Sequence, residues 1–140
     1  MALKHVIGGS VVRSRLRKIV RNVNDAVQQE MDDIADELLI TSRDKAPQLH
    51  GTMTDPQHSK TDSKNARRQG RFTRRVKYTT VYAPIQHEKI FRPGPVTAAK
   101  LGNRVGIGKG FLSKPFKKME PKIPRRISKV VARAIRQSVR

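Results

Sequence analysis

The sequence predicts one α+β domain, with a long amino-terminal helix, a small antiparallel sheet and a basic carboxyl-terminal helix. Three observations lead to this fold. Apolar residues recur every three or four positions over residues 11–43, as in an amphipathic helix. Side chains alternate in character over residues 71–83, as in a strand. Helical spacing returns after residue 116, and a chain of 140 residues can bury one modest core, so we expect a single domain over residues 1–140.

The first helix follows a short arm, residues 1–9, and Ser10 is a suitable residue to cap it. Pro47 ends the helix, because a proline disfavours the helical conformation in the residue before it. The helix is basic in its first turns and acidic in its middle, which opposes the helix dipole. We therefore expect these charges to make contacts with a partner rather than to stabilise the helix itself. The apolar stripe is formed by Val12, Leu16, Ile19, Val23, Ala26, Val27, Met31, Ile34, Leu38 and Leu39.

The middle of the chain predicts a long basic loop over residues 48–70, because this stretch is polar and has few apolar residues. The strand over residues 71–83 follows, and Pro84 stops it before one helical turn over residues 85–90. Residues 91–110 are rich in glycine and proline and predict a loop with a short strand at 104–108, which would complete the sheet. The expected core side of the strand carries Phe72, Arg74, Val76, Tyr78, Thr80 and Tyr82.

The last predicted helix begins near Phe116 and is interrupted by Pro121 and Pro124. Its stripe consists of Ile127, Val130, Val131, Ala134, Ile135 and Val139, with basic residues around it. Ahead of this helix stand Phe111, Leu112 and Phe116, large apolar residues in a chain with 4 Phe. We predict that these three residues anchor the helix on the sheet or on a neighbouring subunit.

Charge is the strongest physical property of the chain. It has 31 Lys and Arg against 11 Asp and Glu, a formal net charge of +20, which favours a polyanionic partner. Apolar residues make up 36% and aromatic residues 4%, a thin supply for an independent core, so burial against a partner is expected. The absence of cysteine excludes disulfides and thiolate chemistry.

The charges are segregated along the chain, which indicates two surfaces with different partners. Most acids lie between residues 25 and 44, and within them we predict an acidic patch for the basic surface of a neighbouring subunit. The patch is Asp32, Asp33, Asp36 and Glu37. Bases dominate residues 60–77 and 109–140, and we predict that several of them face DNA or an acidic partner. These are Lys64, Arg67, Arg68, Arg71, Arg74, Arg75 and Lys109.

No segment predicts an enzyme, a metal site or a cofactor. His87 and Glu88 are adjacent, and adjacent side chains rarely converge on one ion, while the other histidines show no ligand spacing. The glycine-rich stretch 102–110 lacks the phosphate-loop pattern, because Lys109 is followed by glycine. We interpret Gln86, His87 and Glu88 as a structural corner after Pro84, or as a subunit contact.

Two segments resemble a known family when they are taken in order. They are Tyr82-Ala83-Pro84-Ile85-Gln86-His87-Glu88 and Gly110-Phe111-Leu112-Ser113-Lys114-Pro115-Phe116. Together they resemble the tail-completion proteins (head–tail joining, neck or minor capsid proteins) of long-tailed bacteriophages. There, a similar run closes a strand and a later F-L-x-x-[PA] box opens the last helix. Ala46-Pro47 followed by Gly51-Thr52-Met53 is similar to a third segment of the family, with Met53 in place of leucine.

The resemblance implies a structural virion protein that joins head to tail as a ring around the DNA channel. It implies a homo-oligomer of about six copies, in contact with the head adaptor, the tail-tube or tail-terminator proteins and the packaged DNA. It also implies a place in the virion, after assembly in the host cytoplasm.

Two alternatives remain open from the sequence. A small sequence-nonspecific nucleic-acid-binding protein, ribosomal or nucleoid-like, fits the charge and length equally well. The basic carboxyl-terminal helix is also compatible with a membrane surface, although we expect no membrane partner. No apolar run approaches the length of a membrane span, and residues 1–9 lack the apolar core of a signal peptide.

Overall fold

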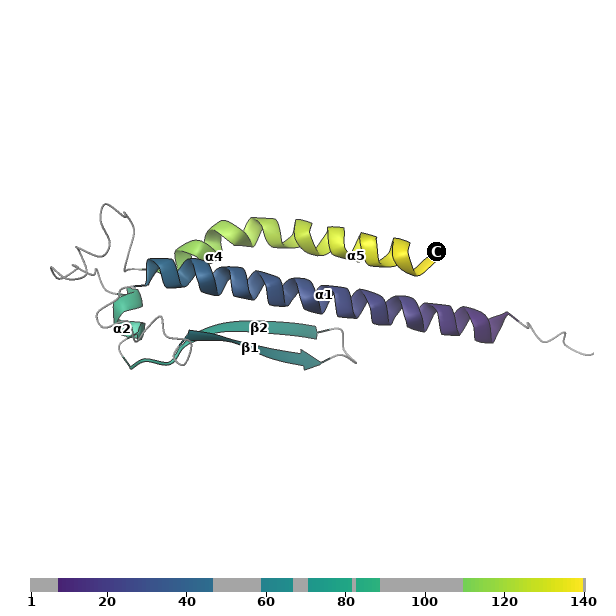
Figure 1. The fold of residues 1–140 in the computed structure, drawn as a ribbon, viewed down its shortest axis with the longest axis horizontal. Coiled ribbons are helices and arrows are strands. Elements are labelled where there is room, and N and C mark those ends of the chain that lie inside the picture. Colours follow the sequence, from purple (N-terminus) through teal and green to yellow (C-terminus); the bar gives the residue numbers. More distant parts are fainter. Residues whose placement is uncertain (1–7, 47–58, 67–70, 82, 89–109, 140) are drawn as a thin grey trace, which may run out of the picture.

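The protein combines three main helices with a two-stranded sheet in a computed structural model, which describes residues 8–46, 59–66, 71–81, 83–88 and 110–139. Figure 1 shows the longest helix between two layers, with the last helix on one side and the hairpin on the other. The α+β class with a long first helix and a carboxyl-terminal helix is therefore confirmed. The elements are α1 (Gly9–Lys45), β1 (Ser59–Ala66), β2 (Arg71–Tyr78), α2 (Ala83–Glu88), α4 (Ser113–Met119), the 3₁₀ turn η2 (Glu120–Lys122) and α5 (Ile123–Val139).

Helix α1 is one uninterrupted helix of 37 residues. It begins after Gly8 without a side-chain cap, so Ser10 lies inside the helix and is not its cap. It ends where Ala46 turns to extended backbone ahead of Pro47, as the sequence predicted. Arg43 and Lys45 occupy the last turn, where positive charge complements the helix dipole.

The sheet is an antiparallel hairpin in which Ser59 lies opposite Tyr78 and Ala66 lies opposite Arg71. This corrects the loop predicted over residues 48–70, because that range contains β1. Its strand has no large apolar residue, so no alternation marked it in the sequence. Backbone pairing with β2 specifies the strand instead. The expected partner strand at 104–108 lies outside the described residues.

Strand β2 alternates as expected from its sequence. Phe72, Arg74 and Val76 are partly buried, while Thr73 and Arg75 are exposed. The strand ends at Tyr78 rather than at residue 83, because the chain turns at Thr80 and α2 begins at Ala83. The helical turn expected after Pro84 is therefore present.

The carboxyl-terminal region is helical from Ser113, slightly earlier than the predicted start at residue 116. Pro121 lies in η2 and separates α4 from α5, since proline removes a helical donor. Pro124 falls in the first turn of α5, where no intrahelical donor is needed. Helix α5 then runs antiparallel to α1, and Asn22 Nδ2 donates to Ser138 Oγ at 2.9 Å near its end.

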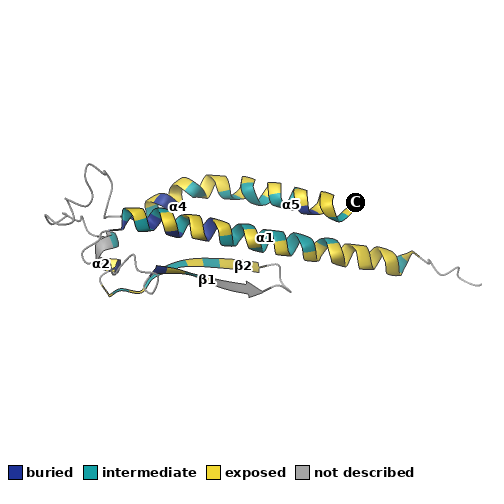
Figure 2. Cartoon of the chain, in the orientation of Figure 1, coloured by how far each residue is buried: buried dark blue, intermediate teal, exposed yellow. Residues whose placement is uncertain are grey.

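The core is small and lies toward the carboxyl-terminal end of α1. Figure 2 shows the buried positions concentrated there, whereas the first turns of α1 are exposed. This uneven burial agrees with the thin supply of apolar residues in the composition. The buried apolar residues are Ile34, Ala35, Leu39, Ala46, Ala83, Phe111 and Ala134.

Candidate interaction surfaces

An aromatic cluster joins the two segments that the sequence analysis singled out. The Phe111 ring is 2% exposed. It meets Tyr78 edge to face, with centroids 5.0 Å apart, and meets His87 in the same way at 5.1 Å. The Gly110 N–H donates to the His87 carbonyl at 2.9 Å. The cluster therefore anchors the start of the carboxyl-terminal region on the hairpin and α2.

The turn before α4 requires glycine. Gly110 has a φ of 74°, in the left-handed region. A Cβ at this position would also lie 3.1 Å from Ser113 Oγ. Leu112 packs against the aromatic cluster. Phe116 is 42% exposed and lines a small cavity with Ile34 and Val76. Phe111 is thus the main anchor of the predicted trio.

Polar contacts tie the end of α1 to the base of the hairpin. Ser42 Oγ donates to the Leu39 carbonyl at 2.9 Å, and it lies 2.5 Å from the Tyr78 hydroxyl. Because the single Ser42 proton is used on Leu39, Tyr78 acts as donor to Ser42. Burial raises the pKa of the Tyr78 phenol, and the hydrogen bond with Ser42 and the positive charge of Arg43 offset only part of that rise. Arg43 itself donates to Ser59 Oγ at 2.7 Å and to the Ser59 carbonyl at 2.6 Å.

His87 belongs to this packed corner. Its ring packs on Phe111, and its Nδ1 atom is buried without a hydrogen-bond partner. Within the described parts of the chain, no group of three His, Cys, Asp or Glu residues could hold a metal ion. The side chains of Gln86 and Glu88 lie outside what the structure describes. The geometry of His87 is that of a packed structural residue.

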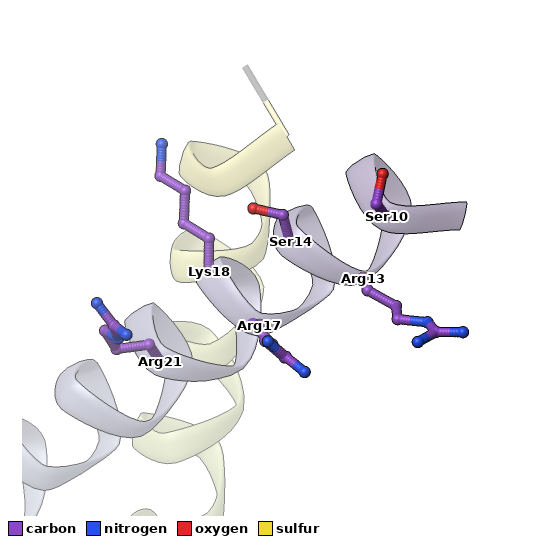
Figure 3. Close-up of a pocket in the computed structure, with 6 residues that line it drawn as sticks. All are labelled: Ser10, Arg13, Ser14, Arg17, Lys18 and Arg21. Atoms are coloured by element: carbon purple, nitrogen blue, oxygen red, sulfur yellow. The ribbon is translucent and has the colours of Figure 1, made fainter. Parts of the chain in front are cut away.

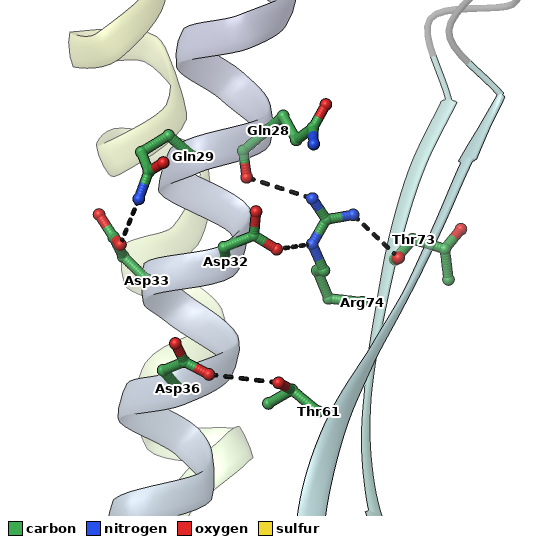
Figure 4. Close-up of polar contacts among 8 residues, drawn as sticks. All are labelled: Gln28, Gln29, Asp32, Asp33, Asp36, Thr61, Thr73 and Arg74. Carbon is green, nitrogen blue, oxygen red and sulfur yellow. Dashed lines mark hydrogen bonds and ion pairs between the residues drawn. The ribbon is translucent and has the colours of Figure 1, made fainter.

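Arg74 turns toward α1 rather than toward solvent. Figure 4 shows its guanidinium between β2 and the helix, where Nε pairs with Asp32 and Nη2 donates to the Gln28 carbonyl at 3.4 Å. The Arg74 side chain is 4% exposed. This corrects the DNA-facing prediction for Arg74, whose side chain is turned inward. Asp32 pairs with it but stays 41% exposed, so its place in the predicted acidic patch is not contradicted. The alternation of β2 had already placed Arg74 on the core side.

Arg126 from α5 bridges two acids of α1. Its Nε lies 2.6 Å from Glu30 Oε1, and its Nη1 lies 2.5 Å from Glu37 Oε2. Hydrogen bonds to Glu37 and Glu30 raise the pKa of Arg126. Glu37 is therefore paired within the subunit, although its side chain stays 54% exposed beside the other acids of the predicted patch. The sequence analysis missed Arg126, and the spacing of seven between two acids on one helix face was the available signal.

The remaining predicted acids lie on the exposed side of α1. Asp36 accepts a hydrogen bond from Thr61 Oγ1 at 3.3 Å, and Asp33 accepts one from Gln29 Nε2 at 3.1 Å (Figure 4). Both aspartates are exposed, as are Asp25 and Asp44. The outer side of α1 beyond residue 24 is therefore acidic.

The six predicted basic residues other than Arg74 divide into three groups. Arg71 and Arg75 are exposed on β2. The side chain of Lys64 is not described, although its backbone is part of β1. Arg67, Arg68 and Lys109 lie outside the described residues. Nearby, Lys77 Nζ forms an exposed pair with Asp62 at 2.6 Å, a contact of small energetic value.

The first turns of α1, residues 9–21, form what we call the α1 extension, because they lie beyond the contact of Asn22 with the end of α5 (Figure 1). Its apolar row, Val12, Leu16 and Val20, is exposed. This row continues the stripe that α5 and the hairpin cover farther along α1. Figure 3 shows polar and basic side chains of the α1 extension that line a shared pocket, which are Ser10, Arg13, Ser14, Arg17, Lys18 and Arg21.

A second basic surface lies on the outer side of α5. Arg125, Lys129, Arg133 and Arg136 are exposed there at spacings of three and four, and we call them the α5 row. Ser128, Ala132 and Gln137 line a shallow groove with three of these bases. Helix α5 contains no acid. The sequence analysis noted these bases but did not name them as a site.

No protein-family model matches this chain, and no curated protein or solved structure is similar to it. The likeness to tail-completion proteins therefore remains a proposal. None of the helices in the described residues is long and apolar enough to cross a membrane.

Proposed function

We propose that this chain is a non-enzymatic structural subunit of the neck of a long-tailed bacteriophage, where a ring of copies joins head to tail around the DNA channel. The resemblance of three segments to tail-completion proteins motivates the proposal. The observation that carries it is the uncovered apolar row of the α1 extension. Val12, Leu16 and Val20 are each more than half exposed, and such rows on a soluble protein mark sites of association.

The partner that best fits this row is a second copy of the chain. The α1 extension carries five bases and no acid. The exposed acids Asp25, Asp33, Asp36 and Asp44 gather on the outer side of the same helix farther along, together with exposed Ile40. An extension that lies against this acidic side of a neighbour brings opposite charges together and covers apolar residues on both copies.

This arrangement matches the proposed ring. The two surfaces, extension and acidic side, are different patches of one chain. A contact between different patches is heterologous, and heterologous contacts repeat until they close into a ring or extend into a filament. In the proposed virion, the head adaptor and the tail-tube or tail-terminator proteins would limit the assembly to a closed ring.

The test is the size of the assembly in solution. We expect sedimentation near physiological salt to detect oligomers, either of the protein alone or with adaptor or tail-tube protein, and electron micrographs to show rings. Leu16→Asp should abolish assembly without unfolding the subunit, because Leu16 is exposed in the isolated chain. A strict monomer in every mixture contradicts the ring.

A control separates assembly from general surface chemistry. Val81 is 92% exposed and lies outside both patches. Val81→Asp makes the same kind of change and should leave the assembly intact. Equal loss in both variants would show that added negative charge, and not the α1 extension, controls association.

A second candidate function is sequence-nonspecific nucleic-acid binding in a ribosomal or nucleoid-like protein, favoured by the exposed bases of the α5 row. Particle association distinguishes the two functions. A neck protein copurifies with virions in a fixed low copy number, whereas a nucleoid-like protein follows bulk nucleic acid.

A further inference from the structure

We infer that the α5 row, rather than the hairpin, is the surface that contacts the phosphate backbone of duplex DNA. The inference rests on the proposed function for its ligand, since packaged DNA is the polyanion that a neck ring encloses. It goes beyond that function by assigning the contact to four residues, Arg125, Lys129, Arg133 and Arg136.

The first argument is that the four charges of the α5 row have no acidic neighbours on their own helix. The segment from Ser113 to Val139 contains one acid, Glu120, which precedes α5. Like charges at a spacing of four residues repel each other on a helix surface. A partner that supplies regularly spaced negative charge relieves this repulsion, and DNA presents one charge for about every 1.7 Å of its axis.

The second argument is shape. The α5 row runs from Arg125 to Arg136, twelve residues whose end-to-end separation is roughly 16 Å at the usual helical rise. Between its bases lie Ser128, Ala132 and Gln137, which are small or polar and line a groove. No large apolar side chain lines that groove, so a sugar–phosphate backbone can approach the bases closely. Serine and glutamine side chains are also common phosphate donors.

The third argument is that the other basic surfaces fit DNA less well. The bases of the α1 extension share their short helix segment with an exposed apolar row, which suits a protein partner. On the hairpin, Arg74 is engaged with Asp32 and Lys77 is paired with Asp62. In the part of the chain that the structure describes, β2 therefore offers only Arg71 and Arg75 as exposed bases outside an ion pair, against four bases in the α5 row. A membrane is also a poor partner for α5, because an interfacial helix inserts its apolar face. That face of α5 packs on α1, where Ala134 is buried.

The test compares two full-length variants that lose the same charge. The first replaces the α5 row: Arg125→Gln, Lys129→Gln, Arg133→Gln and Arg136→Gln. The matched control replaces four exposed bases of the α1 extension: Arg13→Gln, Arg17→Gln, Lys18→Gln and Arg21→Gln. All eight residues are exposed, so both variants should keep the fold, which the thermal midpoint checks.

Fluorescence anisotropy on two unrelated duplexes over a series of salt concentrations is the measurement. Each lost phosphate contact reduces the slope of log affinity against log salt by about 0.9. We expect the α5 variant to lose about 3 to 4 from this slope on both duplexes, and the control to lose clearly less. Equal losses in the two variants, or an unchanged slope in the α5 variant, would overturn the inference.

Two further measurements, a competition experiment and sedimentation, define the ligand and separate this inference from the proposed function. Polyglutamate of matched charge should compete poorly with the duplex, and equal competition would overturn the assignment to nucleic acid. Sedimentation of the wild type and of the α5 variant measures assembly, because the control variant changes bases that the proposed subunit contact itself uses. Rings with an unchanged slope in the α5 variant contradict only the DNA surface, whereas a slope loss without rings supports the DNA surface and contradicts only the neck ring.

Discussion

The two parts of α1 share one apolar stripe but have different surroundings. Beyond Asn22 the stripe is covered by α5 and the hairpin, and Leu39 is 7% exposed. In the α1 extension the same stripe continues, yet Leu16 is 55% exposed. The periodicity of a helix thus determines which face is apolar. Tertiary cover determines which part of that face stabilises the fold and which part stays exposed.

The largest predicted loss of stability comes from Phe111, the aromatic anchor of the buried core. Phe111→Ala is expected to lower the free energy of unfolding by about 3–5 kcal/mol, since a buried ring is lost. Chemical denaturation measures this loss, and the thermal midpoint should fall with it. Phe116→Ala is the control, and because Phe116 is 42% exposed its loss should be clearly smaller. Equal losses would place the anchor elsewhere.

A matched pair of leucines on α1 sharpens the comparison directly. Leu39→Ala should cost about 2–5 kcal/mol of unfolding free energy, because it leaves a cavity. Leu16→Ala should change the same quantity by less than about 0.5 kcal/mol in the monomer. Denaturant titration at low protein concentration is the measurement. Similar costs at the two sites would mean that the α1 extension is covered within the subunit.

A smaller effect is expected from the ion pair between α1 and β2. Asp32→Ala removes the carboxylate beside the buried Arg74 guanidinium, and the expected cost is about 1–3 kcal/mol of unfolding free energy. Asp33→Ala changes the next residue, which is exposed, and should have little effect. If the two variants are equally stable, Arg74 does not depend on Asp32.

The smallest predicted effect is a pH dependence at Tyr78. Its pKa is raised in the folded state from the ordinary value of 10.0. The unfolded state therefore loses the phenol proton first, so the contribution of Tyr78 is complete below pH 10 and falls as the pH rises further. Denaturant titrations at several pH values give the free energy of unfolding of wild type and of Tyr78→Phe. Above pH 10 that free energy should fall more steeply with pH in the wild type than in the variant. Parallel curves would contradict the raised pKa.

Local patterns in the sequence predicted α1, β2, α2 and α5, because each of them follows from periodicity or proline position. They did not predict β1, since Ser59–Ala66 has no apolar alternation and pairs through its backbone. Arg74 shows how one pattern can override another. Its place in the alternation indicated the core side, but its charge led to a DNA-facing assignment.

The candidate surfaces were predictable only in part. The sequence located the acids and bases but not which of them meet. Asp32 and Arg74 are 42 residues apart, and Glu30 and Arg126 are 96 apart, so their pairing depends on the packing of whole elements. The packing removes Arg74 from the external surface, whereas Asp32 and Glu37 are paired but stay exposed. Exposed bases remain on the α1 extension and the α5 row.

The alternation of β2 also has a consequence for how the hairpin finds its alignment. A shift of one residue would turn Phe72, Arg74 and Val76 away from α1 and present Thr73, Arg75 and Lys77 to it. Only the observed register places a cation, Arg74, beside Asp32 and turns apolar side chains of β2 toward the apolar stripe of α1. Two strands alone are marginally stable in water. Helix α1 therefore acts as a template that selects one strand register, and the hairpin is expected to settle only after that helix has formed.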